Sequence, residues 1–134
     1  MIGRYFAGLE NETFPERTAI GLLKESSLRY GENPHQNAAV YEDAMTTSLM
    51  TGMTQLHGKE LSFNNLNDLN TALELASEFE EPAVAVIKHA TPCAAAIGST
   101  IFEAFVRAYE ADKMSIFGGI VAMNKEMDAE TATA

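Results

Sequence analysis

Residues 82–93 read PAVAVIKHATPC, and the apolar run at their start decides the fold class. Because residues 83–87 are continuously apolar and have the length of a strand, they predict a strand that is covered on both faces. Segments of helical periodicity lie before and after this strand. The order of helices and strands predicts an α/β layer with a right-handed crossover and at least partly parallel strand pairing.

A helix is predicted before this strand, where the spacing of the apolar residues changes to 3.6. Asn64 or Asn65 is the expected N-cap, and Asp68 has the position of a favourable charge in the first turn. The helix is expected to end near Phe79, because Pro82 follows. Its apolar face comprises Leu66, Leu69, Leu73 and Ala76.

A second helix is predicted after the strand by a capping box, because Thr100 is followed three residues later by Glu103. Its expected apolar face comprises Ile101, Phe105, Ala108 and Tyr109. A further strand is predicted over residues 116–123, entered through Gly118 and Gly119, and Asp128 is the expected cap of a last helix.

The sequence of the N-terminal half indicates fewer regular helices and strands. Short apolar runs predict strands at 18–23 and 38–41, separated by the polar loop LRYGENPHQ at 28–36. Two extended pieces are expected around a turn at 57–59. Residues 1–9 have the spacing of a helix that begins outside the chain, and the last helix stops after about one turn, so we expect a piece of a longer protein.

The composition restricts the function classes. A chain of 134 residues that is 46% hydrophobic predicts one compact domain, and Cys93 alone excludes an intramolecular disulfide and a thiolate zinc cage. The single cysteine and the lack of an 18-residue apolar run predict a soluble, cytoplasmic protein. A net charge of -10 opposes binding to nucleic acid or to an anionic membrane.

Lys88 and His89 directly follow the buried strand, at the edge where α/β folds usually bind ligands. An ammonium group stabilises developing negative charge, and an imidazole transfers a proton near neutral pH. A Lys-His pair at a strand end is also typical of a solvated terminus, so both interpretations stay open. The two side chains serve one site only if the backbone turns after the strand, and Pro92 favours such a turn.

Other candidate residues give weaker signals. Arg29 and Tyr30 combine a planar cation suited to phosphate or carboxylate with a phenol. Cys93 is expected to be a small buried hydrophobe rather than a nucleophile. The histidines at positions 35, 57 and 89 lack the close spacing of a metal site, so no metal is predicted. Neither a P-loop nor a GxGxxG motif occurs.

Four motifs together resemble one family. They are LRYGENPHQ at 28–36, GKELSFNN at 58–65, KHATPC at 88–93 and DKMSIFGGIVAMN at 112–124. Their order and spacing are similar to those of the bifunctional purine biosynthesis proteins, which combine AICAR formyltransferase with IMP cyclohydrolase. The resemblance implies that residues 1–13 are a linker from a missing cyclohydrolase domain and residues 14–134 the N-terminal part of the formyltransferase domain. It also implies an incomplete cytidine deaminase-like layered sheet with helices, and a homodimer in the full-length protein.

The reaction implied by the resemblance transfers a formyl group from the co-substrate 10-formyltetrahydrofolate to AICAR, giving FAICAR, without a metal. Lys88 and His89 match the family's catalytic pair: His89 assists proton transfer from the attacking amine, and Lys88 stabilises charge on the formyl group. The resemblance implies AICAR contacts for Arg29, Tyr30, Asn65 and Gly118, with the guanidinium facing the phosphate. It implies that Met114 and Phe117 lie near the folate.

One motif departs from the family pattern, because many members have Asn-Pro-Cys-Gly where this chain has Thr91-Pro92-Cys93-Ala94. Ala94 is expected to be strained if the backbone there requires a positive φ, or to crowd a ligand. Since much of the family's protein is missing, we expect the isolated chain to be inactive. The alternative function is a non-catalytic α/β module that binds a nucleotide or a partner, and a third interpretation is self-association through an exposed sheet edge.

Overall fold

The computed structural model describes residues 19–43, 46–50 and 52–134. The elements are β1 (Leu22–Ser27), β2 (Ala39–Asp43), α2 (Phe63–Ser77), β3 (Ala83–Lys88), β4 (Thr91–Ile97), α3 (Ile101–Ala111), β5 (Ile120–Met123) and α4 (Ala129–Thr133). The helix end expected at residues 1–9 and the linker expected at 1–13 lie outside the described residues. Among the described residues, no helix is long and apolar enough to cross a membrane.

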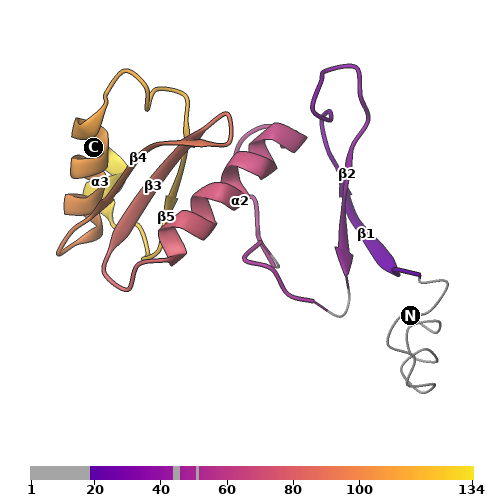
Figure 1. The fold of residues 1–134 in the computed structure, drawn as a ribbon, viewed down its shortest axis with the longest axis horizontal. Coiled ribbons are helices and arrows are strands. Elements are labelled where there is room, and N and C mark those ends of the chain that lie inside the picture. Colours follow the sequence, from indigo (N-terminus) through magenta and orange to yellow (C-terminus); the bar gives the residue numbers. More distant parts are fainter. Residues whose placement is uncertain (1–18, 44–45, 51) are drawn as a thin grey trace.

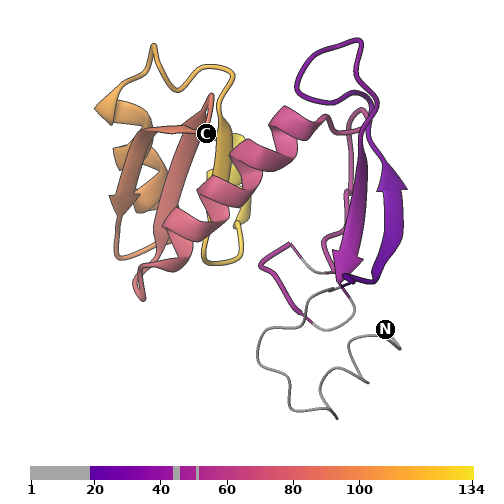
Figure 2. The same ribbon diagram turned by 45° about the vertical axis from the view of Figure 1, so that its right-hand side comes forward.

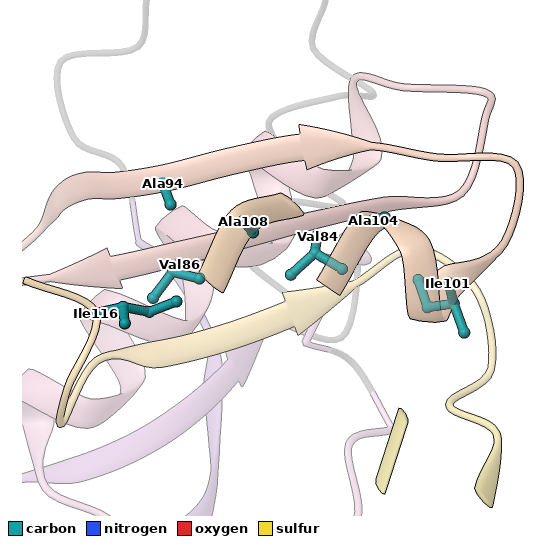
Figure 3. Packing of buried hydrophobic residues seen from close by; sticks show 7 residues of the cluster. All are labelled: Val84, Val86, Ala94, Ile101, Ala104, Ala108 and Ile116. Carbon is teal, nitrogen blue, oxygen red and sulfur yellow. The ribbon is translucent and has the colours of Figure 1, made fainter. Parts of the chain in front are cut away.

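The C-terminal part of the chain forms a mixed α/β structure in three layers. A three-stranded sheet in the order β4-β3-β5 lies between α2 on one face and α3 on the other (Figures 1 and 2). Alternate residues of β3 point to opposite faces. Val84 and Val86 pack in the cluster that includes α3, as Figure 3 shows, and Ala85 and Ile87 pack in the cluster that includes α2. The prediction of a strand covered on both faces is confirmed.

The prediction of parallel pairing is wrong for the described strands. β3 pairs antiparallel with both β4 and β5, because the chain folds straight back along β3 after Lys88. β4 was not predicted, because its sequence TPCAAAI is rich in alanine and contains a proline. Pro92 is accommodated because β4 lies at an edge of the described sheet, and the register shifts there, between Val86 and Ile87.

The first long helix, α2, begins earlier than the sequence predicted. Its N-cap is Ser62 rather than Asn64 or Asn65, and Asn65 instead supplies the other half of a capping box. No acidic residue lies in the first turn, so the role expected there for Asp68 is also wrong. The helix ends at Ser77, slightly before the predicted end. The fully buried members of its inner face are Leu66, Ala72 and Ala76.

The cap predicted for the second long helix, α3, is confirmed in part. Thr100 accepts a hydrogen bond from the backbone N–H of Glu103, but the Glu103 carboxylate binds the backbone and hydroxyl of Ser99 instead of returning to Thr100. Tyr109, expected on the apolar face, is exposed, because Ala104 and Ala108 form the buried face with Ile101.

The remaining C-terminal elements agree with the sequence in type. Asp128 caps α4 through the backbone N–H of Thr131, as predicted. β5 is shorter than the strand predicted over residues 116–123.

The N-terminal region is a two-stranded antiparallel hairpin followed by an irregular connection. β2 confirms the strand predicted at 38–41, whereas β1 shares only Leu22 and Leu23 with the strand predicted at 18–23, and all of its residues are exposed. The turn predicted at 57–59 is confirmed as a bend, with Gly58 at a φ of 97°. The Gln55 side chain closes this bend by donating to the carbonyls of His57 and Lys59. The extended pieces on either side of it form no strand.

Candidate functional site

The turn between β3 and β4 is the centre of the candidate site. Lys88 pairs with Thr91, and only His89 and Ala90 lie between them, with φ values of 53° and 56°. Positive φ at both central residues is the geometry of a type I′ hairpin turn, which usually contains glycine or asparagine. Each left-handed residue with a side chain costs about 1–2 kcal/mol, so the surrounding structure must hold this turn. The backbone turn that the sequence analysis required after Lys88 is present.

Contacts from two other elements fix this turn. The Asp68 carboxylate, on α2, accepts a hydrogen bond from the backbone N–H of Ala90 at 2.7 Å. The half-buried Lys88 side chain donates from Nζ to the carbonyl oxygen of Phe117 at 3.0 Å. An ammonium group has three donors, so further donors of Lys88 remain for a ligand. The His89 side chain is exposed. The turn therefore begins at a half-buried cation that is bound to another loop and continues with an exposed imidazole.

The loop before β5 contacts the β3–β4 turn through the hydrogen bond between Lys88 and Phe117. Asp112 accepts hydrogen bonds from Met114 and Ser115, and the Ser115 side chain is the main cause of its lowered pKa. Gly118 has a φ of 76°, which favours glycine. A Cβ on Gly119 would lie 2.9 Å from Cγ1 of Val86, so this loop approaches β3 closely.

Two apolar side chains of this loop extend into solvent. Met114 is 88% exposed and Phe117 is 84% exposed. These are the two residues for which the resemblance implies a position near the folate. Large exposed apolar side chains beside a polar site are typical of a surface that a ligand or another chain covers.

A second group of predicted residues lies at the N-terminus of α2. The Arg29 backbone donates to the Leu61 carbonyl, and the Phe63 backbone donates to the Tyr30 carbonyl, so the loop of residues 28–36 is attached to the start of the helix. The guanidinium of Arg29 lies 4.8 Å from the centroid of the Tyr30 ring and donates to its hydroxyl. Hydrogen bonding from Ser62, and then from Arg29, lowers the pKa of Tyr30.

Electrostatics at this helix end favour an anion. The Arg29 guanidinium donates to the Tyr30 hydroxyl, which is also hydrogen-bonded to the N-cap Ser62 at the positive end of the α2 dipole. The first turn of α2 contains no acidic residue to offset either charge. The side-chain oxygen of Asn65 accepts from the backbone and hydroxyl of Ser62. Its amide NH₂ is consequently the part of Asn65 that suits a ligand.

The two groups lie at the same end of α2. Figures 1 and 2 show the β3–β4 turn beside the N-terminal half of this helix. Asp68, which binds the turn, follows the N-cap Ser62 by about 9 Å along the helix axis at 1.5 Å per residue. No local pattern in the sequence predicts this contact of Asp68, because it joins residues far apart in the chain.

A cavity of about 630 Å³ lies elsewhere, between the hairpin and the connection that follows it. Its apolar lining includes Leu22, Leu28, Met50, Met53 and Leu66. No candidate site residue named in the sequence analysis is among its lining residues, so the cavity and the β3–β4 turn are separate features.

Ala94, which stands where many family members have glycine, does not strain the backbone. Ala94 lies in the extended strand β4, and the non-glycine residues with positive φ in the described chain are His89 and Ala90. Ala94 packs in the buried cluster on the α3 face, as Figure 3 shows. The expected strain at this position is wrong. Cys93 is half-buried rather than fully buried. The described residues contain no group of three His, Cys, Asp or Glu side chains suited to a metal ion.

Comparisons with known proteins identify the family. The family profile described as AICARFT/IMPCHase bienzyme matches residues 1–134. The bifunctional purine biosynthesis protein PurH of Anoxybacillus flavithermus is 52% identical over 133 residues, which cover 98% of this chain and 26% of that protein. The proteins of the same name from Listeria innocua and Shouchella clausii are 51% and 52% identical over the same shares. The chain spans about a quarter of the length of these relatives, and it belongs to the AICARFT/IMPCHase bienzyme family.

Proposed function

We propose that this chain acts in purine biosynthesis as the first part of a formyltransferase domain, which transfers a formyl group from 10-formyltetrahydrofolate to AICAR and gives FAICAR. The observation that carries the proposal is the β3–β4 turn, where Lys88 is bound to the loop of Phe117 and is followed directly by the exposed His89. The family match and the identity of about half the residues to PurH proteins support it.

The chemistry of the turn suits this transfer. The amine of AICAR is aromatic and therefore a poor nucleophile, so it gains from a base that removes its proton as it attacks the formyl carbon. His89 takes that proton. Lys88 stabilises the negative charge that develops on the formyl oxygen. The bond from the formyl carbon to the folate nitrogen then breaks, and that nitrogen takes a proton.

The second group of residues suits the nucleotide. Arg29 is exposed beside the positive end of α2, and a guanidinium there binds the phosphate of AICAR. Tyr30, the amide NH₂ of Asn65 and the backbone of Gly118 supply further contacts. The exposed side chains of Met114 and Phe117 cover the folate. Holding both substrates in place contributes to the rate alongside the proton transfer.

The rest of the site belongs to segments outside this chain. The proposal includes a cytidine deaminase-like sheet that those segments complete, a domain boundary near residue 14, a cytoplasmic homodimer, and catalysis without a metal. Because the chain spans 26% of its relatives, the isolated chain is expected to show no turnover.

A complementation assay tests the proposal. The chain is mixed with AICAR and 10-formyltetrahydrofolate, alone and together with the remaining part of the Anoxybacillus flavithermus protein made as a separate polypeptide. We expect turnover only in the mixture, and its loss in Lys88→Ala and His89→Ala. His57→Ala, which changes an exposed histidine in the bend, serves as the matched control. Unchanged rates in the first two variants would contradict the assigned roles.

A non-catalytic nucleotide-binding module is the second candidate, and the exposed Arg29 near the N-terminus of α2 favours it. Calorimetric titration of AICAR separates the two functions. Binding that Arg29→Ala abolishes, with no turnover in the complemented mixture, supports the binding module. Turnover in that mixture rejects it.

A further inference from the structure

We propose that Asp68 is a positioning residue, whose carboxylate holds the His89-Ala90 turn in its left-handed conformation and so fixes where the imidazole and the neighbouring ammonium stand. The catalytic consequence rests on the proposed function, whereas the conformational claim is independent of it. Asp68 acts through the backbone of the turn, since its contact there is with the N–H of Ala90.

The turn needs support because two residues with side chains adopt backbone angles that favour glycine. The ladder between β3 and β4 does not supply that support, since its last pair is Lys88 with Thr91 and Ala90 lies beyond it. The N–H of Ala90 therefore has no partner in that ladder and is available to an acceptor from outside the hairpin.

Asp68 is well suited to be this acceptor. Its Oδ1 lies 2.7 Å from the nitrogen of Ala90, the length of a charge-assisted hydrogen bond. The residue is half-buried on α2, and this helix packs against β3. The carboxylate is thus carried by a rigid element rather than by a loop.

The same helix carries the other half of the candidate site. Its capping box includes Asn65, and its first residue, Phe63, donates to the backbone carbonyl of Tyr30. Asp68 therefore links the proton-transfer residues to the element that holds the nucleotide-binding residues. Loss of this link should disturb proton transfer while leaving the phosphate contact of Arg29 in place.

Nuclear magnetic resonance on the 134-residue chain tests the conformational claim. We expect slow exchange of the Ala90 amide hydrogen, and strong amide-to-Hα cross-peaks within His89 and Ala90, which report positive φ. In Asp68→Ala the exchange becomes at least about tenfold faster and the cross-peaks weaken. Asp68→Asn keeps both signals, because its amide oxygen still accepts a hydrogen bond.

Two further variants make the result specific. Glu74→Ala removes a carboxylate from the same helix, where it binds Asn70, and should leave the turn unchanged. Ala90→Gly in the Asp68→Ala background should restore the cross-peak of His89, because glycine adopts the left-handed conformation without support. Retained protection and cross-peaks in Asp68→Ala would overturn the proposal.

Kinetics in the complemented mixture test the catalytic consequence. We expect Asp68→Ala to lower kcat about 10- to 100-fold with the KM for AICAR within about twofold, and Asp68→Asn to retain most of the activity. A normal kcat in a variant whose turn has changed would overturn the positioning role. If the unsubstituted mixture shows no turnover, the proposed function fails, and the exchange and cross-peak data alone decide whether Asp68 holds the turn.

Discussion

The two groups of candidate residues follow strands that differ in burial: the Lys88-His89 turn follows β3, and the Arg29-Tyr30 pair follows β1. Val84 and Ile87 are 1% and 0% exposed between two helices, whereas Leu22 and Leu23 are 48% and 62% exposed on the hairpin. A two-stranded hairpin is marginally stable by itself, so the N-terminal region depends on its attachment to the start of α2. The Lys88-His89 turn thus directly follows a strand of the packed core, whereas the Arg29-Tyr30 pair depends on a few backbone hydrogen bonds.

The largest expected difference between the two regions concerns buried volume. Ile87→Ala should lower the free energy of unfolding by about 2–5 kcal/mol, because it leaves a cavity between β3 and α2. Leu23→Ala, the matched change on the hairpin, should alter it by less than about 0.5 kcal/mol. Urea denaturation measures both. Equal losses in the two variants would contradict the contrast between the regions.

A smaller loss is expected where the loop before β5 meets β3. Gly119→Ala should destabilise the chain by about 1–3 kcal/mol, because the new Cβ would lie 2.9 Å from Val86 and 3.1 Å from the carbonyl of Ile87. Gly52→Asn is the control for the N-terminal region, because no atom lies within 4 Å of the position of its Cβ and asparagine tolerates its φ of 76°. Urea denaturation should show a larger loss for Gly119→Ala, and the reverse order would disprove this close approach.

Ser62→Ala tests the attachment between the two regions. Loss of the N-cap should cost about 1 kcal/mol of unfolding free energy and should also loosen the loop that carries Tyr30. Ser77→Ala removes a hydroxyl at the other end of α2 and should change the free energy of unfolding by less than about 0.5 kcal/mol. Thermal unfolding and amide exchange at Phe63 measure the two effects, and an unchanged exchange rate at Phe63 in Ser62→Ala counts against the attachment.

The smallest effect concerns pH. Hydrogen bonds from Ser115 lower the pKa of Asp112, so the folded state binds this proton less tightly than the unfolded state does. The resulting stabilisation is complete above the unfolded pKa of about 4 and is lost as the pH falls through the lower folded value. Asp112→Asn should therefore show a shallower loss of stability below about pH 4. Parallel pH profiles of the urea midpoint for the two proteins would contradict this role.

Local patterns predicted those parts of the fold that depend on neighbouring residues. The apolar run of β3, the cap of α3 at Thr100 and the cap of α4 at Asp128 follow from spacings within a few residues. Pro92 was expected to favour a backbone turn after Lys88, but the turn lies at His89 and Ala90, and Pro92 lies in β4. The strand β4 was not predicted, because an alanine-rich segment with a proline has low strand propensity, and its pairing with β3 stabilises it.

The candidate site was predictable residue by residue but not as an arrangement. The motifs singled out Lys88 and Arg29, whereas the contacts that fix them come from Phe117, Asp68 and Leu61. Such contacts depend on how α2 crosses the sheet, and no periodicity within the sequence encodes that crossing. Asp68 in particular has the pattern of an ordinary helix residue.

The central claim is that the Lys88-His89 turn and the Arg29-Tyr30 pair serve one site at one end of α2. Titration with AICAR tests it most directly, with this chain isotopically labelled and the remaining part of the Anoxybacillus flavithermus protein supplied unlabelled. The account predicts amide shifts in both groups that saturate with a single affinity. Shifts confined to one group, or saturation of the two groups at different affinities, would contradict it.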